Sequence, residues 1–159
     1  MRTHAWFGVL EPAADGSFDF QKVVTIKGDD VLVSIHFDGI AGVSDETLDA
    51  IALLCGRPEA LTETARAQMA LDVVESGSAT SMYFDFLKDE APDVLGKTTR
   101  EGFVQMLKPE KLWSWLEASV TPSALSLQLD FNAAPGEIDH VVCTRFDACG
   151  KIVSIDLES

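Results

Sequence analysis

The stretch from Phe18 to Phe37 constrains the fold more than any other part of the chain, because its pattern is typical of one β-hairpin. Apolar and polar residues alternate over 18–26, where Lys22 is the only break, and they alternate again over 31–37. A period of two is the signal of strands that bury one face. Between the arms, Gly28-Asp29 offers a two-residue loop with glycine first, which suits a type II′ turn. We therefore predict a hairpin with Gly28-Asp29 at its tip.

This turn fixes a register, and the register gives the hairpin two unlike faces. The predicted cross-strand pairs, all on one face, are Ile26 with Val31, Val24 with Val33, and Phe20 with Phe37. The other face carries mostly polar residues, namely Asp19, Gln21, Val23, Thr25, Leu32, Ser34, His36 and Asp38. A sheet of this kind is half solvated and needs cover on its apolar side.

Helix signals fill the middle of the chain. Ser44 is a good N-cap with acidic residues after it, and Pro58 suits the first position of a second helix. Thr98 and Glu101 have the spacing of a capping box. The predicted helical segments are 44–56, 58–77, 78–90 and 98–107, with a loop over 91–96.

Strand patterns return in the last third of the chain. The predicted strands are 6–10 near the start, and then 111–117, 123–131, 138–146 and 151–157. The last two form a second hairpin, in which Cys143 faces Ile155. Strands in two blocks around a helical block indicate an α+β fold, with an antiparallel sheet of about six or seven strands and roughly three or four helices packed on one face. We expect a single domain over residues 1–159.

The charge of the chain is its strongest global feature. Twelve basic residues against 26 acidic ones give a formal net charge of −14, and every third of the chain has an acidic excess. A phosphate backbone or an anionic membrane requires a basic face, so nucleic acid and membrane are disfavoured as partners. The acidity has two interpretations: it keeps the protein soluble, or it attracts and steers a basic protein partner.

Cysteine usage and hydropathy indicate the compartment. Three cysteines at irregular spacing do not form a disulfide framework. The apolar stretch 6–10 is too short for the core of a secretory signal, and no apolar run approaches the roughly 20 residues of a membrane span. We therefore expect a reduced, cytoplasmic protein.

No motif of known chemistry occurs in the sequence. Phosphate-binding, dinucleotide-binding, zinc-protease and nucleophile-elbow patterns are all missing, and the three histidines have no ligand partner at helical spacing. Cys55 and Cys143 fall on apolar faces and are interpreted as core, whereas Cys149 falls in a turn. We predict no catalytic residue, no metal site and no cofactor, and hence a protein that is not an enzyme.

Two groups of residues are candidates for contact with a protein partner. The first is a set of carboxylates at the tip of the hairpin and the start of the first helix, namely Asp29, Asp30, Asp45, Glu46 and Asp49. Helix capping and compensation of the helix dipole explain Asp45 and Glu46 without any partner.

The second group is a pair of tryptophans, Trp113 and Trp115, which share one face of a predicted strand. Such a pair is usually part of the core. If the face with Leu112 and Leu116 is the core instead, both indoles are exposed as a binding patch.

The C-terminal stretch from His140 to Ser159 resembles the closing hairpin of a family of small bacterial proteins of unknown function. Phe146-Asp147 and Gly150 match a Phe-Asp-x-x-Gly turn between two strands, and the chain ends in Glu-Ser as members of that family do. The segment Ser44 to Asp49 is similar to the start of that family's helical block. The resemblance implies a fold and no catalytic residues. Small acidic α+β proteins of this kind also look like immunity proteins of bacterial toxin systems.

The leading hypothesis is a non-enzymatic cytoplasmic binding protein, with an immunity protein that occludes a basic toxin as its specific form. One alternative is a small enzyme or ligand-binding domain with a pocket between sheet and helices, where His36, Asp38 and His140 meet on the solvent side of the sheet. Another is a homodimeric structural module that uses an exposed Trp113/Trp115 face. The oligomeric state is left open by the sequence.

Overall fold

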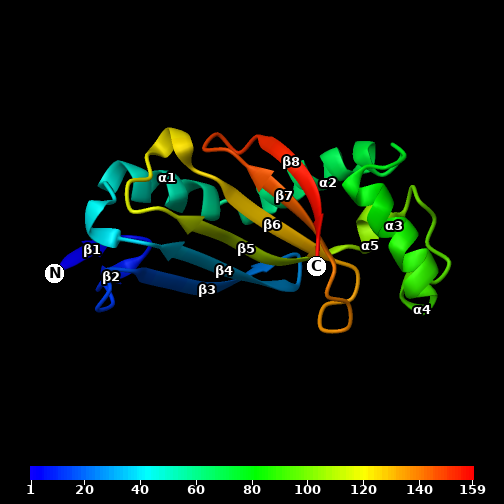
Figure 1. The fold of residues 1–159 in the computed structure, drawn as a ribbon, viewed down its shortest axis with the longest axis horizontal. Helices are drawn as coiled ribbons and strands as arrows, with labels where there is room; N and C mark the ends of the chain where they lie inside the picture. Colours follow the sequence, from blue (N-terminus) through cyan, green and yellow to red (C-terminus); the bar gives the residue numbers. More distant parts are fainter.

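The computed structural model describes all residues 1–159 and contains one large and one small sheet with five α-helices (Figure 1). The large sheet has six strands in the order β3-β4-β5-β6-β7-β8. These are β3 (Phe18–Ile26), β4 (Asp29–Phe37), β5 (Lys108–Leu116), β6 (Leu127–Asn132), β7 (Val141–Phe146) and β8 (Ile152–Glu158). Only β4 and β5 run parallel, and the other neighbouring pairs are antiparallel.

The helices all lie between β4 and β5 in the chain. They are α1 (Asp45–Cys55), α2 (Pro58–Asp72), α3 (Ala79–Glu90), α4 (Pro92–Leu95) and α5 (Phe103–Met106), with the 3₁₀ turns η1 (Ile40–Gly42) before them and η2 (Pro122–Ala124) after β5. The helices pack against the sheet, with α1 and α2 behind it and α3 beside its far end in Figure 1. The predicted α+β class is therefore confirmed. No helix combines the length and the apolar character that crossing a membrane would require.

The parallel pair is the main departure from the predicted antiparallel sheet, and the helical block explains it. A helical segment after a strand can carry the chain back to the end of the sheet where that strand began. A neighbouring strand that starts from there runs parallel to the first. Here the residues between Phe37 and Lys108 form that crossover. The two strand blocks recognised in the sequence are therefore halves of one sheet, joined where β4 meets β5.

The first hairpin forms as predicted, but its predicted tip is wrong. Ile26 pairs with Asp29, so the two-residue loop is Lys27-Gly28. Both residues have positive φ, 48° and 90°, which is the type I′ conformation favoured by the right-handed twist of strands. The register therefore differs by two residues from the prediction, and Phe18 rather than Phe20 pairs with Phe37. Because two residues are one full period of a strand, the apolar face is preserved.

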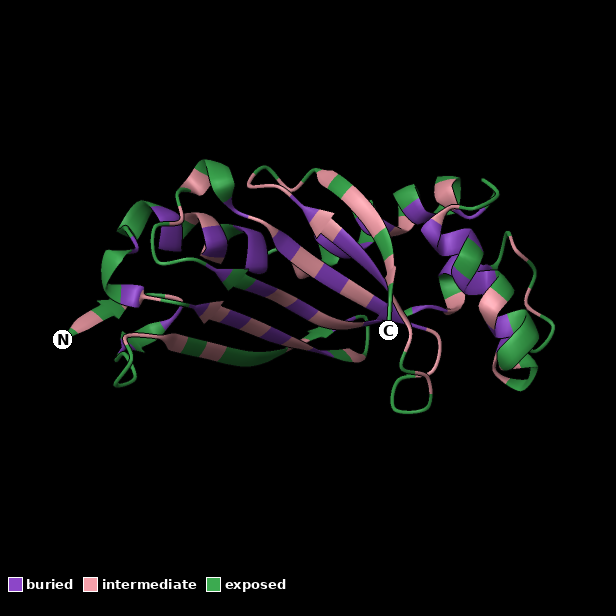
Figure 2. Ribbon diagram, in the orientation of Figure 1, coloured by how far each residue is buried: buried purple, intermediate pink, exposed green.

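The core lies between the sheet and the helices, and the hairpin supplies one side of it. Figure 2 shows the alternation of buried and less buried residues along the strands. Facing the helices, fully buried strand residues include Val31, Val33, Ile35, Phe37, Leu112, Leu116, Leu127, Leu129, Phe131, Val142 and Phe146. From the helices, Leu48, Ile51, Leu54, Met69, Tyr83 and Leu87 complete the same cluster.

Helix starts agree with the sequence at α1 and α2. The Ser44 hydroxyl accepts a hydrogen bond from the Thr47 backbone N–H at 3.1 Å, and Pro58 occupies the first turn of α2. The end of α2 was predicted at Gly77, but the helix ends at Asp72. The Asp72 side chain instead accepts the Thr80 backbone N–H at 3.0 Å, and so ties the end of α2 to the start of α3.

Other predicted boundaries are wrong as well, among them that of the strand over 123–131, which begins only at Leu127, after η2. The predicted loop over 91–96 contains the short helix α4, which Pro92 begins. The predicted helix at 98 forms only from Phe103, because the Thr99 hydroxyl accepts the Gly102 N–H at 3.2 Å in a turn. The predicted strand at 6–10 is instead a hairpin of β1 (Arg2–His4) and β2 (Gly8–Leu10).

The C-terminal hairpin contains a bulge that shifts its predicted register by one residue. Phe146 pairs with Ile152, but Thr144 pairs with Ile155 and Cys143 with Asp156, so the predicted pairing of Cys143 with Ile155 is wrong. The shift lies between Arg145 and Phe146, because Arg145 pairs with Ser154 and Phe146 with Ile152, so that Val153 is an extra residue on β8. The side chains of β7 alternate without a break: Val142, Thr144 and Phe146 are buried on the core face, and Cys143 lies on the opposite face, where it is also buried.

The observed type I′ turn can be tested at Lys27, which lies inside it at positive φ. In the predicted type II′ turn at Gly28-Asp29, Lys27 would instead be an ordinary strand residue. We expect Lys27→Val to lower the free energy of unfolding by about 1–2 kcal/mol, because a β-branched residue fits poorly at positive φ. Lys27→Asn should leave it unchanged or raise it slightly, because asparagine tolerates this conformation. Both variants lose the exposed contact between Lys27 and Glu63 at 2.9 Å, so they are matched. Urea unfolding measures both, and a stable Lys27→Val variant would contradict the observed turn.

Candidate binding surface

The face of the large sheet that points away from the helices carries the candidate site. We call it the open face and define it by the residues that alternate with the core positions on the four central strands. These residues are Leu32, Ser34 and His36 on β4, Lys111, Trp113 and Trp115 on β5, Gln128 and Asp130 on β6, and Val141, Cys143 and Arg145 on β7. Asp19 on β3 extends it beside His36. An antiparallel sheet commonly leaves one face to solvent, as here.

The two tryptophans lie on this open face. Leu112 and Leu116 are only 1% and 3% exposed, so their side of β5 is the core side. Of the two interpretations of the tryptophan pair, the structure therefore agrees with the one that places the indoles outside the core. Trp115 is 66% exposed, whereas Trp113 is half-buried, so the two residues do not present equal surfaces.

Trp115 is held by a small cluster of polar side chains. Its indole Nε1 donates a hydrogen bond to Asp38 Oδ1 at 2.8 Å. The His36 ring lies against the indole with its centroid 4.0 Å away. His36 itself contacts Asp19 through Nδ1 at 2.7 Å and Asp38 through Nε2 at 3.4 Å. We call Asp19, His36, Asp38 and Trp115 the Trp115 cluster, and its contacts fix an exposed indole in one orientation.

Trp113 belongs to a second cluster that is more deeply buried. Its Nε1 donates to Asp130 Oδ2 at 2.9 Å, and the Lys111 ammonium lies 5.6 Å from the ring centre. The Cys143 thiol donates to Gln128 Oε1 at 3.5 Å. The other Asp130 oxygen, Oδ1, is buried without a hydrogen-bond partner. Trp113 therefore covers a carboxylate, and its role in the surface is structural.

Burial perturbs the titration of this second cluster. It raises the pKa of Asp130, and the hydrogen bond from Trp113 opposes this only in part. Burial also raises the pKa of the Cys143 thiol, with the Asp130 charge acting in the same direction. The Cys55 thiol, buried under α1, has its pKa raised to about 12 by desolvation. Both cysteines are thiols at neutral pH, and a thiol is a poor nucleophile.

The candidate carboxylates of α1 lie on the opposite side of the molecule from the tryptophans, because α1 packs on the core face. Asp45 Oδ1 contacts Arg2 Nη2 at 2.6 Å, and Asp49 Oδ1 contacts His4 Nε2 at 3.0 Å. The Arg2 guanidinium lowers the pKa of Asp45. These two carboxylates attach strand β1 to α1, and Glu46 beside them is exposed.

Asp29 and Asp30 lie at the turn of the first hairpin, apart from both other groups. Asp29 is half-buried, and exposed Asp30 accepts a hydrogen bond from the Thr25 hydroxyl at 3.2 Å. The seven candidate contact residues thus occupy three places: the hairpin turn, the start of α1 and the open face. No two of these three groups lie together on one surface.

The pocket alternative required His36, Asp38 and His140 to converge; the structure brings His36 and Asp38 together but places His140 far from both. His36 is paired with Trp115 at the end of β5, whereas the His140 carbonyl accepts a hydrogen bond from Tyr83 Oη near the beginning of that strand. Seven residues of strand between these points span roughly 20 Å. The His140 ring stacks on Phe86 of α3 instead, with centroids 4.1 Å apart. That alternative is left without a converging set of side chains.

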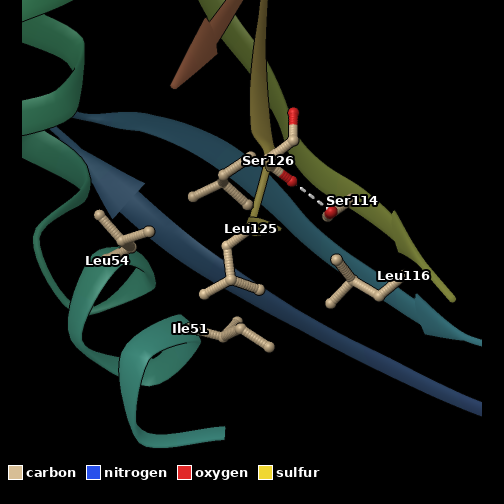
Figure 3. Close-up of a pocket in the computed structure, with 7 residues that line it drawn as sticks. Ile51, Leu54, Ser114, Leu116, Leu125 and Ser126 are labelled. Carbon is tan, nitrogen blue, oxygen red and sulfur yellow. Dashed lines mark hydrogen bonds between the residues drawn. The ribbon is translucent and has the colours of Figure 1, made fainter. Parts of the chain in front are cut away.

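The space between α1 and the sheet is too small for a substrate. Ile51 and Leu54 of α1 face Leu116, Leu125 and Ser114 across a cavity of about 10 Å³ (Figure 3). A volume of this size holds at most about one water molecule. The Ser114 hydroxyl donates to the Ser126 carbonyl within the lining. No three His, Cys, Asp or Glu side chains converge as a metal site would require.

Several residues of the open face were missed in the sequence. Asp19, Asp130 and Arg145 were not candidates, and Cys143 was interpreted as core, whereas it is buried on the face away from the helices. The alternation of β3 and β6 does place Asp19 and Asp130 on polar faces, so that signal was available. What joins them to tryptophans is the order of the strands, which no local pattern specifies.

The Asp130 environment predicts how stability depends on pH. An acid whose pKa is raised by folding binds more protons in the folded state, so its contribution is present at low pH and lost as pH rises through the folded pKa. We expect Asp130→Asn to be more stable than the natural protein at pH 7, and to lose less stability as pH rises above about 4. Urea unfolding across pH 3–8 measures this.

Asp45→Asn is the control, because its effect on stability should depend on pH in the opposite direction. The pKa of Asp45 is lowered, so its contribution is present above the ordinary carboxyl pKa and lost as pH falls. If Asp130→Asn lowered the free energy of unfolding at pH 7 and left its pH dependence unchanged, the charge of the buried Asp130 carboxylate would not destabilise the folded state.

Comparisons with known proteins leave this surface to be interpreted from its own geometry. No family model, no curated protein and no solved structure matches the chain. The resemblance drawn from the C-terminal hairpin stays a prediction. What the molecule offers for interpretation is a fold, a sheet face without helices and one exposed indole held in place.

Proposed function

We propose that the protein is a non-enzymatic binding protein whose open face docks a basic protein partner. The observation that carries this proposal is the exposure of Trp115, 66%, on a sheet face that the helices do not cover. Tryptophan is among the residues that contribute most to binding at protein interfaces. An indole already held by His36 and Asp38 also loses little side-chain entropy on binding.

The net charge supports a basic partner. A formal charge of −14 on 159 residues attracts a positively charged protein from a distance and accelerates the encounter. On the open face, Asp19 and Asp38 place two carboxylates next to Trp115. The expected complex therefore combines long-range attraction by charge with a short-range aromatic anchor.

An immunity protein is the specific form of this proposal. Such a protein would lay its open face over the basic active-site surface of a toxin and block access to it. The size, the acidity and the lack of a substrate-sized space between α1 and the sheet fit a role in which occlusion is the whole mechanism. This form rests on the likeness in size and charge, and it requires a partner that is both basic and toxic.

A homodimer through the same face is the second candidate function, and the same exposed indole is its support. Two acidic copies repel each other, so the charge that favours a basic partner works against this arrangement. Size-exclusion chromatography with light scattering separates the two candidates: a monomer at micromolar concentration argues against the dimer.

The proposal predicts a partner whose affinity depends on Trp115. The protein is immobilised and exposed to lysate of its source cells, and the retained protein is purified for affinity measurements. We expect Trp115→Ser to weaken binding by about 2 kcal/mol or more, roughly 30-fold. Raising the salt concentration should slow association, because it screens the attraction.

Leu53→Ser is the matched control for this measurement. Leu53 is 64% exposed, nearly as much as Trp115, but it lies on α1, behind the sheet. Its substitution should leave the affinity unchanged. A partner lost with Leu53→Ser and retained with Trp115→Ser would refute the open face as the binding surface.

A further inference from the structure

A hollow of about 470 Å³ opens directly beside Trp115. It lies between the end of β5 and the segment that leads through η2 into β6. Its lining includes Trp115, Glu117, Val120 and the hydroxyl residues Ser119, Thr121 and Ser126. No lysine, arginine or histidine takes part in the lining. The hollow is therefore a slot lined by an aromatic residue, hydroxyl residues and a carboxylate, and without positive charge.

Trp115 lines this slot and keeps a large part of its surface exposed. His36 lies against the ring, with centroids 4.0 Å apart, yet His36 does not line the hollow. Since Trp115 remains 66% exposed beside His36, part of its surface is free for a ligand at this edge of the hollow. Asp38 accepts the indole N–H at 2.8 Å, which places a negative charge at the edge of the ring. Both features favour a cation over the free surface of the indole.

We propose that this slot binds the guanidinium group of an arginine side chain presented by the protein partner. The planar group would stack on Trp115, and Glu117 would accept its N–H donors. Arginine is favoured over lysine because its flat, weakly hydrated group stacks on aromatic rings and offers several donors in a fork. The inference rests on the proposed function, because it names the group by which a basic partner is recognised at that surface.

The slot can be tested without the partner by using N-acetyl-arginine amide as the probe. We expect saturable binding at millimolar concentration, followed through the indole N–H signal of Trp115 in an NMR titration. N-acetyl-citrulline amide has almost the same shape without the charge, and it should bind at least tenfold more weakly. N-acetyl-lysine amide should also bind more weakly than the arginine probe.

Variants assign the binding to this slot. Glu117→Gln should weaken the arginine probe at least threefold, whereas Glu46→Gln, an exposed carboxylate on α1, should have no effect. Trp115→Leu should remove saturable binding, as read from calorimetry, while the amide spectrum stays that of the folded protein. Equal binding of arginine and citrulline probes, or equal effects of Glu117→Gln and Glu46→Gln, would overturn the proposal.

The outcomes also distinguish the slot from the proposed function. If the arginine probe does not bind but the partner still requires Trp115, the slot is wrong and the binding surface stands. If the probe binds as described but a purified partner is unaffected by Trp115→Ser, the slot stands and the proposed function is wrong.

Discussion

The parallel ladder between β4 and β5 is the interaction on which the rest of the structure depends. It is the only contact that makes one sheet of two strand blocks that lie far apart in the chain. Its register places Val33 beside Leu112, so that the apolar faces of both blocks are continuous under the helices. The same register places His36 beside Trp115. The pairing of β4 with β5 therefore determines both the core on one face of the sheet and the candidate surface on the other.

Local patterns were sufficient for the faces of the first hairpin and for the starts of α1 and α2. The alternation around Val33 and Ile35 gave the buried face correctly even with the wrong turn, because an error of two residues does not exchange the faces. Ser44 and Pro58 marked helix starts because caps act over a single turn. The tip of the hairpin was missed because Gly28 fits either of two turn types, and the choice depends on the twist of the paired strands.

The candidate surface was only partly predictable. Apolar residues occupy both faces of β5, since Leu112 and Leu116 alternate with Trp113 and Trp115, so the pattern alone did not decide which face is buried. The pairing with β4 decides it. The carboxylates of α1 could not be interpreted from the sequence either. Asp45 and Asp49 looked like a surface patch, but they bind Arg2 and His4 across more than forty residues of chain. Such long-range pairs follow from tertiary packing, and no local signal reports them.

The central claim is that the open face, and Trp115 above all, is covered when the protein meets its partner. Hydroxyl-radical footprinting of the free and the bound protein tests this directly, because it reports the exposure of individual side chains. Oxidation of Trp115 should fall strongly on binding, while that of exposed Leu53 on α1 and Met82 on α3 stays the same. Protection of Leu53 or Met82, with Trp115 still oxidised at the free rate, would contradict it.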